Sequence, residues 1–245
     1  MRIIAIIPAR YQSKRFHGKP LALIVGKPMI QHVFQRAKEC PELDEIYVAT
    51  DDLRIYDCVQ QFGGEAIMTH EIHLSGTDRI AEAAEKMNLA DKDIVVNIQG
   101  DQPLFQPSII SDLIQALINN PTIPMSSLMY KIKGDQGLHD INKVKVVVDT
   151  HGYALYFSRL PIPFNREEKF KPVYYKHIGI YAYRKKFLFE LTNMASTVLE
   201  RAEKLEQLRV LEYGFKIKMV ETVSDSLEVD APEDIKRVEE NIGPV

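Results

Sequence analysis

Ile3-Ile4-Ala5-Ile6-Ile7-Pro8 opens the chain with a short run of apolar, mostly β-branched residues that ends at a proline. A run of this length and composition is typical of a buried strand. The stretch from Arg10 to Lys19 that follows is polar and rich in basic residues. The start of the chain therefore predicts a buried strand that leads directly into a positively charged loop.

Apolar strand-like runs and helical spacings alternate four times over the next part of the chain. We expect strands at residues 3–7, 45–50, 65–68 and 93–98, and helices at residues 29–38, 53–62, 76–87 and 108–118. Gly63-Gly64 would cap the second helix, because glycine tolerates the left-handed conformation at a helix end. This alternation indicates an α/β fold with a parallel sheet that helices cover on both faces.

After Pro121 the pattern changes. Strands are expected at residues 125–130, 144–149, 153–158 and 176–183, without full helices between them. Helical patterns return at residues 188–213, followed by a strand at 216–221 and a helix from Pro232. We interpret the chain as one α/β domain, residues 1–245, with a small antiparallel extension at roughly 122–190 that could pair two chains into a homodimer.

The composition is that of an ordinary globular protein, with 45% hydrophobic and 27% charged residues among 245. The formal net charge of −3 argues against a general nucleic-acid binder, which usually has a basic excess. The cysteines, Cys40 and Cys58, are too few for a disulfide framework and indicate a reducing compartment. The apolar start is only a strand long, so we expect no membrane insertion and a cytoplasmic location.

The basic loop is the first candidate site, because ligands of an open parallel sheet gather beyond the carboxyl ends of its strands. Arg10, Lys14, Arg15 and Lys19 could bind phosphates, with Ser13 as a hydroxyl donor. The alternative is a solvated loop without function. The glycine patterns of the P-loop and of the dinucleotide-binding fingerprint are both missing, which disfavours a kinase and an oxidoreductase.

Two acidic segments are the next candidates. Asp101 follows the strand at 93–98 and could bind Mg²⁺, although a carboxylate in this position could also simply form a turn. Asp230 precedes the last helix, where it could cap the helix and form a capping box with Glu233. A metal-binding role for Asp230 requires it to meet Asp101 in space, which sequence spacing does not establish.

Taken together, these segments resemble one family, the cytidylyltransferases that activate 3-deoxy-manno-octulosonate (Kdo) as CMP-Kdo for lipopolysaccharide synthesis. The resemblance covers almost the whole chain and rests on motifs from its start to its end. They are Ile7-Pro8-Ala9-Arg10-Tyr11, Val48-Ala49-Thr50-Asp51-Asp52, Ser75-Gly76-Thr77-Asp78-Arg79, Gln99-Gly100-Asp101, Ala154-Leu155-Tyr156-Phe157-Ser158-Arg159, His177-Ile178-Gly179-Ile180-Tyr181, Leu205-Glu206-Gln207-Leu208-Arg209 and Asp230-Ala231-Pro232-Glu233-Asp234.

The resemblance implies a Rossmann-like nucleotide-diphospho-sugar transferase fold, a homodimer, CTP as substrate and Mg²⁺ as cofactor. It implies that the catalytic groups are Arg10, Lys19, Asp101 and Asp230, of which the two aspartates hold the metal. The nucleotide-binding residues that it implies are Ala9, Arg10, Ser13, Lys19, Ser75, Gly76, Thr77 and Arg79. The implied sugar-acid site consists of Gln99, Arg159, His177, Glu206 and Gln207.

The residue types of the implied acceptor site suit a sugar acid. Arg159 and His177 could meet the carboxylate, while Glu206 and Gln207 could meet hydroxyl groups. Other interpretations stay open: Glu206 and Gln207 could be the exposed face of a helix, and His177 a packed or surface histidine.

Two residues depart from the family pattern. His17 stands where the family usually has proline, so the basic loop could be less rigid, and Gln102 stands where glutamate is common. Together with the short loop after Pro161-Ile162-Pro163-Phe164 and the Pro172-Val173-Tyr174 approach to His177, this pattern resembles the subgroup that acts on 8-amino-3,8-dideoxy-manno-octulosonate (8-amino-Kdo). These features concern the acceptor and leave the chemistry unchanged.

The expected reaction is an in-line attack of the anomeric hydroxyl on the α-phosphate of CTP, with release of pyrophosphate. The competing hypotheses are an enzyme of the same fold that acts on another sugar acid or sugar phosphate, such as a CMP-sialic acid synthetase, a non-catalytic nucleotide-binding protein, and a structural dimerisation module.

Overall fold

The computed structural model describes residues 1–12, 15–73, 75–135, 137–167 and 169–242. The chain divides into two compact units. The first contains residues 1–111, 183–192 and 226–245, and the second contains residues 112–182 and 193–225. The expected excursion at 122–190 overlaps the second unit, and its role in dimerisation stays a prediction.

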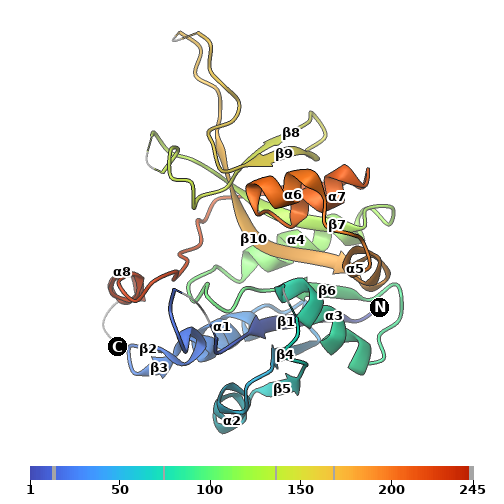
Figure 1. The fold of residues 1–245 in the computed structure, drawn as a ribbon, viewed down its shortest axis with the longest axis vertical. Helices are drawn as coiled ribbons and strands as arrows, with labels where there is room; N and C mark the ends of the chain where they lie inside the picture. The colour runs from blue at the N-terminus through green and yellow to red at the C-terminus, as the bar shows by residue number, and fades with distance from the viewer. Residues whose placement is uncertain (13–14, 74, 136, 168, 243–245) are drawn as a thin grey trace. The chain divides into compact units, whose positions relative to one another are not determined.

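The first unit is built around β1 (Ile3–Ala9), which lies between two parallel neighbours (Figure 1). β4 (Glu45–Thr50) is on one side, β6 (Ile94–Asn97) is on the other, and β5 (Glu65–Met68) continues the sheet beyond β4. Every residue from 3 to 7 is buried, although successive side chains of a strand point to opposite faces. Both faces of β1 are therefore covered, as the alternation of strands and helices predicted.

Helices follow these strands in the expected order. They are α1 (Met29–Lys38), α2 (Leu53–Gln61), α3 (Gly76–Lys86) and α4 (Ser108–Ile118), with α5 (Lys185–Thr192) and α8 (Asp234–Ile242) later in the chain. α1 buries Ile30, Val33, Phe34 and Ala37, a spacing that lies on one side of a helix. The helical pattern that predicted α1 is therefore the pattern that packs it.

A small hairpin between β1 and α1 was not predicted. The hairpin is formed by the two short strands β2 (Leu23–Ile24) and β3 (Lys27–Pro28), and the 3₁₀ helix η1 (Lys19–Leu21) precedes it. Ile24 of this hairpin packs in one apolar cluster with Met29, Val229 and Val238. This cluster anchors the C-terminal segment, including the residues next to Asp230, against the segment that follows the basic loop.

The second unit combines parallel and antiparallel pairing. β11 (Ile217–Thr222) lies parallel to β7 (Met125–Lys131). β8 (Lys145–Val148) is antiparallel to both β9 (Ala154–Ser158) and β10 (Tyr175–Arg184), as expected for the extension. The helices α6 (Val198–Glu203) and α7 (Gln207–Glu212) complete the unit.

Some predicted boundaries were wrong. β1 continues through Pro8 to Ala9, because the φ angle of proline is compatible with extended backbone. The helical stretch expected at 188–213 is three helices, and Lys204 takes a left-handed conformation, φ 55°, after α6. A left-handed residue ends a helix, and the apolar spacing across Lys204 concealed this break.

The expected cap of the last helix was also wrong. α8 begins at Asp234 rather than Pro232, and the Asp234 carboxylate accepts hydrogen bonds from the backbone N–H groups of Asp230 (2.9 Å) and Ala231 (3.0 Å). Asp234 is therefore the acidic residue that organises this turn. The Asp230 side chain is instead engaged by Arg15, with a distance of 2.9 Å between Nη2 and Oδ1.

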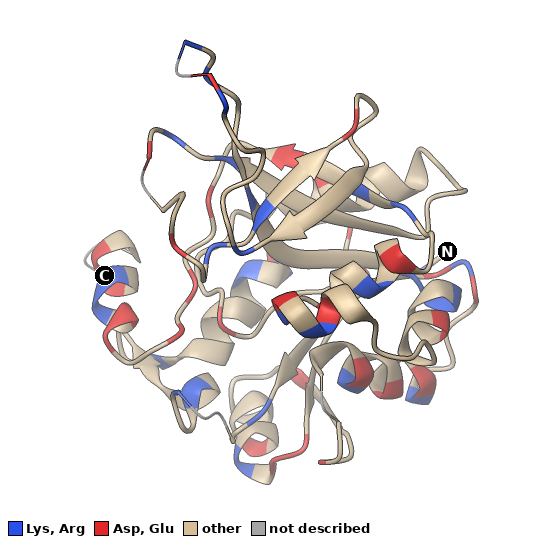
Figure 2. Ribbon diagram, turned by 45° about the horizontal axis from the view of Figure 1, so that its top comes forward, with Lys and Arg blue, Asp and Glu red and all other residues tan. Residues whose placement is uncertain are grey.

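Most helices carry charged residues of both signs (Figure 2), whereas α1 has only basic and α4 only acidic ones. Within the described part of the chain, no helix has the length and apolar character needed to cross a membrane.

Gly100 provides a test of the packing at the end of β6. A Cβ atom at this position would lie 2.9 Å from the Pro8 carbonyl oxygen, and backbone cannot yield as a side chain can. We expect Gly100→Ala to lower the free energy of unfolding by about 1–3 kcal/mol. Gly179→Ala is the matched control, because nothing lies within 4 Å of its added Cβ, and it should be nearly neutral. Urea denaturation of both variants checks this, and equal stabilities would contradict it.

Candidate active site

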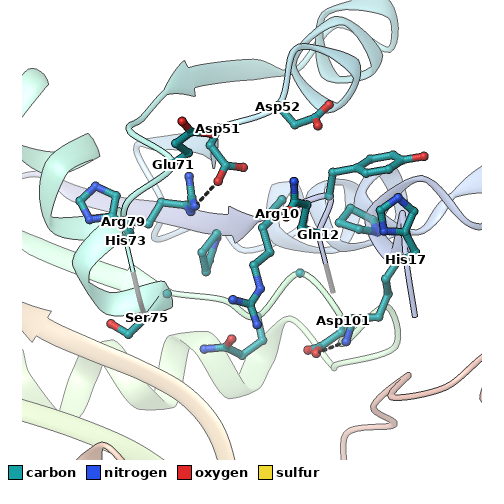
Figure 3. Close-up of a pocket in the computed structure, with 18 of the residues that line it drawn as sticks. Arg10, Gln12, His17, Asp51, Asp52, Glu71, His73, Ser75, Arg79 and Asp101 are labelled. Atoms are coloured by element: carbon teal, nitrogen blue, oxygen red, sulfur yellow. Dashed lines mark hydrogen bonds and ion pairs between the residues drawn. The ribbon is translucent and has the colours of Figure 1, made fainter. Parts of the chain in front are cut away.

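The carboxyl ends of β1, β4 and β6 meet at one edge of the first unit's sheet. Ala9 is aligned with Thr50, and Ile6 with Asn97, so the loops that follow these strands emerge side by side. They surround a pocket of about 990 Å³ (Figure 3), large enough for a nucleotide. Its lining residues are Pro8, Ala9, Arg10, Tyr11, Gln12, Arg15, His17, Lys19, Pro20, Asp51, Asp52, Glu71, His73, Ser75, Gly76, Arg79, Gln99, Gly100 and Asp101.

The basic loop supplies cations to this pocket. Figure 3 shows Arg10 between the Arg79–Asp51 pair and Asp101. Lys19 belongs to η1, and its ammonium donates to Asp101 Oδ2 (2.7 Å) and to the Val229 carbonyl (3.0 Å). The predicted phosphate ligands Arg10 and Lys19 therefore line one pocket. Ser13 and Lys14 lie outside the described residues.

The two candidate metal ligands lie on adjacent segments of the first unit. The Val229 N–H donates to the Asp101 carbonyl oxygen (2.9 Å), which places the residue before Asp230 against Asp101. Lys19 strengthens this junction, since it contacts both segments. The structure therefore brings the two segments together, and a metal ion shared by the two side chains stays a prediction.

The carboxylate oxygens of Asp101 and Asp230 are donors that suit Mg²⁺. Among the described residues, no group of three or more His, Cys, Asp or Glu side chains could hold a metal ion. Phosphate oxygens and water would have to complete the coordination, as is usual for Mg²⁺ in nucleotide sites. The donor set thus fits a metal that binds together with a triphosphate.

The N-terminus of α3 forms another wall of the pocket. Ser75 caps this helix, and its hydroxyl accepts from the Asp78 N–H (3.1 Å). Gly76 packs against Pro8, whose Cγ would lie 3.3 Å from a Cβ at this position. Thr77 is buried and is not among the lining residues. Ser75 and Gly76 therefore line the pocket, whereas Thr77 is buried, and their contacts with a nucleotide stay predictions.

Arg79 lines the pocket but is only 3% exposed. Its guanidinium donates to Asp51 Oδ2 (2.7 Å) and to Thr69 Oγ1 (2.5 Å). These contacts tie α3 to the loops after β4 and β5. Arg79 thus acts here as a strut of the pocket wall.

Gln99 lines the same pocket as Arg10 and Lys19, and its amide donates to Asn97 Oδ1 (3.0 Å). The other residues implied for the sugar-acid site belong to the second unit. Arg159 there donates to three backbone carbonyls: from Nε to Glu203 (2.6 Å), from Nη1 to Ile141 (2.9 Å) and from Nη2 to Lys204 (3.4 Å). Its guanidinium therefore fastens the end of α6 to the segment before β8.

His177 is a buried histidine with a polar contact at each ring nitrogen. Nε2 lies 2.8 Å from Ser127 Oγ, and Nδ1 lies 3.4 Å from the buried Gln207 amide nitrogen. Burial, together with the charge of Lys176, lowers the pKa of His177 to about 3. The imidazole is therefore neutral near pH 7, and its place in a sugar-acid site stays a prediction.

The hydrogen-bond partners of His177 determine which ring nitrogen carries the proton. If the Gln207 amide donates to Nδ1, then Nε2 carries the proton and donates to Ser127, whose hydroxyl donates to Ile180 O (3.0 Å). His177 and Gln207 thus form a hydrogen-bonded pair, while Glu206 occupies the N-cap position of α7. Gln207 is accordingly not part of an exposed helix face.

Sequence reasoning did not assign roles to the pocket residues Tyr11, Gln12, Asp51, Asp52, Glu71 and His73. Asp51 and Asp52 follow β4, and Glu71 and His73 follow β5. The rule that ligands gather at the carboxyl edge applies to these loops as well as to the loop after β1. Applied to every strand, the rule would have found these residues.

Comparisons with known proteins agree with this geometry. A family model described as cytidylyltransferase matches residues 4–219. The chain is 52% identical to 3-deoxy-manno-octulosonate cytidylyltransferase of Syntrophus aciditrophicus, over 97% of this chain and 96% of that protein. It is also 52% identical to 8-amino-3,8-dideoxy-manno-octulosonate cytidylyltransferase of Shewanella pealeana, over 96% of each.

A solved structure of CMP:2-keto-3-deoxy-manno-octonic acid synthetase complexed with CTP has a TM-score of 0.93 with 43% identity. It covers 99% of this chain, and the match spans 98% of that one. This similarity confirms the expected nucleotidyltransferase fold. The matched family model spans most of the chain, and the chain belongs to the cytidylyltransferase family.

Proposed function

We propose that this protein transfers CMP from CTP to the anomeric hydroxyl of Kdo or of 8-amino-Kdo and releases pyrophosphate, for lipopolysaccharide biosynthesis. The observation that carries the proposal is the junction of Asp101 with the segment of Asp230 beside Arg10 and Lys19. The pocket contains the Asp101 carboxylate together with the cations Arg10 and Lys19, and the segment of Asp230 is hydrogen-bonded to Asp101 through Val229. Relatives of both names, each 52% identical, support the acceptor class.

The pocket residues would work by placement and charge. Phosphoryl transfer needs the nucleophile, the phosphorus and the leaving group in line, with little covalent help from the protein. Arg10 and Lys19 would hold the phosphates and stabilise the charge that builds on them as pyrophosphate leaves. Ser75 and Gly76, on the opposite wall, would border the nucleoside.

Asp101 and Asp230 would hold Mg²⁺. The ion, when bound, supplies Lewis-acid polarisation of the phosphate oxygens. The protein's own part is to hold the two segments together, through the Val229 N–H bond to the Asp101 carbonyl oxygen and the contacts of Lys19 with both segments. Lys19 and Arg15 also place a cation against each carboxylate.

The proposed acceptor site combines neutral hydrogen-bonding side chains with a positively charged one. The neutral His177, paired with Gln207, could exchange hydrogen bonds with sugar hydroxyls, and Arg159 supplies the positive charge for the carboxylate. Because relatives named for Kdo and for 8-amino-Kdo are equally similar, the proposal includes both acceptors.

We further propose that the protein acts as a homodimer in the cytoplasm, where CTP is available. The second unit exposes large apolar side chains, among them Leu155 (61%), Phe164 (87%) and Phe170 (64%). Figure 1 shows the segment between β9 and β10, which includes Phe164 and Phe170, extending beyond β8 and β9. Exposed apolar side chains of this kind are typical of protein–protein interfaces.

The substrate proposal is tested by pyrophosphate release. The purified protein is assayed with CTP, UTP, ATP or GTP, each combined with Kdo, 8-amino-Kdo or sialic acid. We expect turnover with CTP and an octulosonic acid, and its loss on chelation of Mg²⁺. Turnover with sialic acid alone would identify the competing sugar-acid activity, and CTP binding without any turnover would indicate a non-catalytic nucleotide-binding protein.

The metal carboxylates are tested by Asp101→Asn and Asp230→Asn. Each variant should lower kcat by about 100-fold or more, because a metal ligand that stabilises the transition state contributes several kcal/mol. Asp91→Asn is the matched control, since Asp91 is an exposed partner of Lys185 outside the pocket. Near-normal Mg²⁺-dependent turnover of both active-site variants, with unchanged thermal stability, would contradict the assignment.

The dimer is tested by light scattering during size-exclusion chromatography. We expect a mass twice that of the 28.1 kDa chain. The double variant Phe164→Ser/Phe170→Ser should shift the equilibrium toward the monomer, since it removes the most exposed apolar area of the β9–β10 segment. Leu23→Ser, at a 61% exposed apolar position of the first unit, should leave the mass unchanged. A wild-type monomer would refute the dimer.

A further inference from the structure

Tyr11 lies at the start of the basic loop and is surrounded by three contacts. The Arg54 guanidinium carbon lies 3.3 Å from the centre of the Tyr11 ring. The His17 ring meets the Tyr11 ring edge-on, at 90° and 4.7 Å between centroids. Gly18 approaches so closely that a Cβ there would lie 3.2 Å from Tyr11 Cζ. The ring is therefore packed both by α2 and by the far end of its own loop.

The backbone closes the same loop. The Gly18 N–H donates to the Tyr11 carbonyl (2.9 Å), and Gly18 has φ +70°, which favours glycine. This bond joins the residue after Arg10 to the residue before Lys19. The distance between the two phosphate-binding cations thus depends on how firmly Tyr11 is held.

Arg54 is itself fixed before it reaches Tyr11. Its Nε and Nη2 donate to the two carboxylate oxygens of Asp52, at 2.9 and 2.6 Å. Asp52 is also the N-cap of α2, and it accepts from the Arg54 N–H (2.9 Å). A two-point contact of this kind sets the plane of the guanidinium, which can then stack on the ring.

Arg54 does not line the pocket, and its side chain is 59% exposed. Its link to the pocket runs through Tyr11 and Asp52, which both line it. A flexible basic loop would lose conformational freedom on binding a triphosphate, which weakens binding. A ring held in advance by α2 reduces that loss.

We propose that Arg54 is a positioning residue, whose guanidinium holds the Tyr11 ring and thereby keeps Arg10 and Lys19 in place for the triphosphate. His17 takes part through its edge contact with the same ring. The inference rests on the proposed function only for the identity of the bound nucleotide.

The first test is hydrogen–deuterium exchange of the free protein. Arg54→Ala and Tyr11→Leu should each speed amide exchange at residues 10–19 by about fivefold or more, with the rest of the chain unchanged. Tyr11→Phe, which keeps the ring, should retain the protection. Arg36→Ala, a surface arginine of α1 paired with Glu39, is the control. Unchanged exchange at residues 10–19 in Arg54→Ala would overturn the proposal.

The second test separates positioning from direct contact with the nucleotide. Arg54→Ala should raise KM for CTP about 5- to 20-fold and leave kcat within about threefold, because it weakens ground and transition states equally. Arg54→Lys should restore only part of the loss, since an ammonium cannot stack and form the paired contact with Asp52 together.

A double variant shows whether Arg54 and Tyr11 act through the same contact. In Tyr11→Leu/Arg54→Ala the rise in KM should not exceed that of the more affected single variant, because both act through one contact. Additive effects would show that Arg54 meets the nucleotide by its own charge, and would overturn the proposal. If the wild-type protein does not turn over CTP, the proposed function fails, while exchange at residues 10–19 still tests the contact between Arg54 and Tyr11.

Discussion

The parallel alignment of β1 with β4 and β6 is the constraint on which the nucleotide pocket depends. β1 is apolar on both faces and lies in the middle of the first unit's sheet, so its register sets the positions of its neighbours. Parallel strands end at the same edge, and the polar loops after them converge there. Gly100 makes this convergence close, since it lets the backbone after β6 approach the Pro8 carbonyl.

Ion pairs then offset the repulsion between the acidic side chains that this edge brings together. Bringing Asp101 and Asp230 onto adjacent segments places like charges near each other, which costs free energy. Lys19 contacts Asp101 and Arg15 contacts Asp230, so each carboxylate has a cation beside it. Lys19 and Arg15 also line the pocket of the first unit. The arrangement thus serves both the stability of the site and its proposed chemistry.

The second unit uses its polar residues differently. Burial keeps His177 neutral, and the hydrogen bonds of His177 to Ser127 and Gln207 satisfy a polar group that would otherwise be costly to bury. Arg159 satisfies backbone carbonyls at the end of α6. Both side chains are therefore held in place by contacts within the second unit.

The sequence by itself determined the elements of the first unit, because local patterns carry the information. The apolar run at 3–7 and the spacing of Ile30, Val33, Phe34 and Ala37 predict a strand and a helix wherever they occur. It also indicated the candidate site, since a basic loop directly after a buried strand lies at a sheet edge. Only the tertiary structure decided which distant residues meet. Residues separated along the chain meet in the hydrogen bond of Val229 with Asp101, the ion pair of Arg79 with Asp51 and the stacking of Arg54 on Tyr11. The neutral state of His177 likewise depends on its burial in the folded chain. Such contacts follow from packing and burial, which spacing in a sequence does not record.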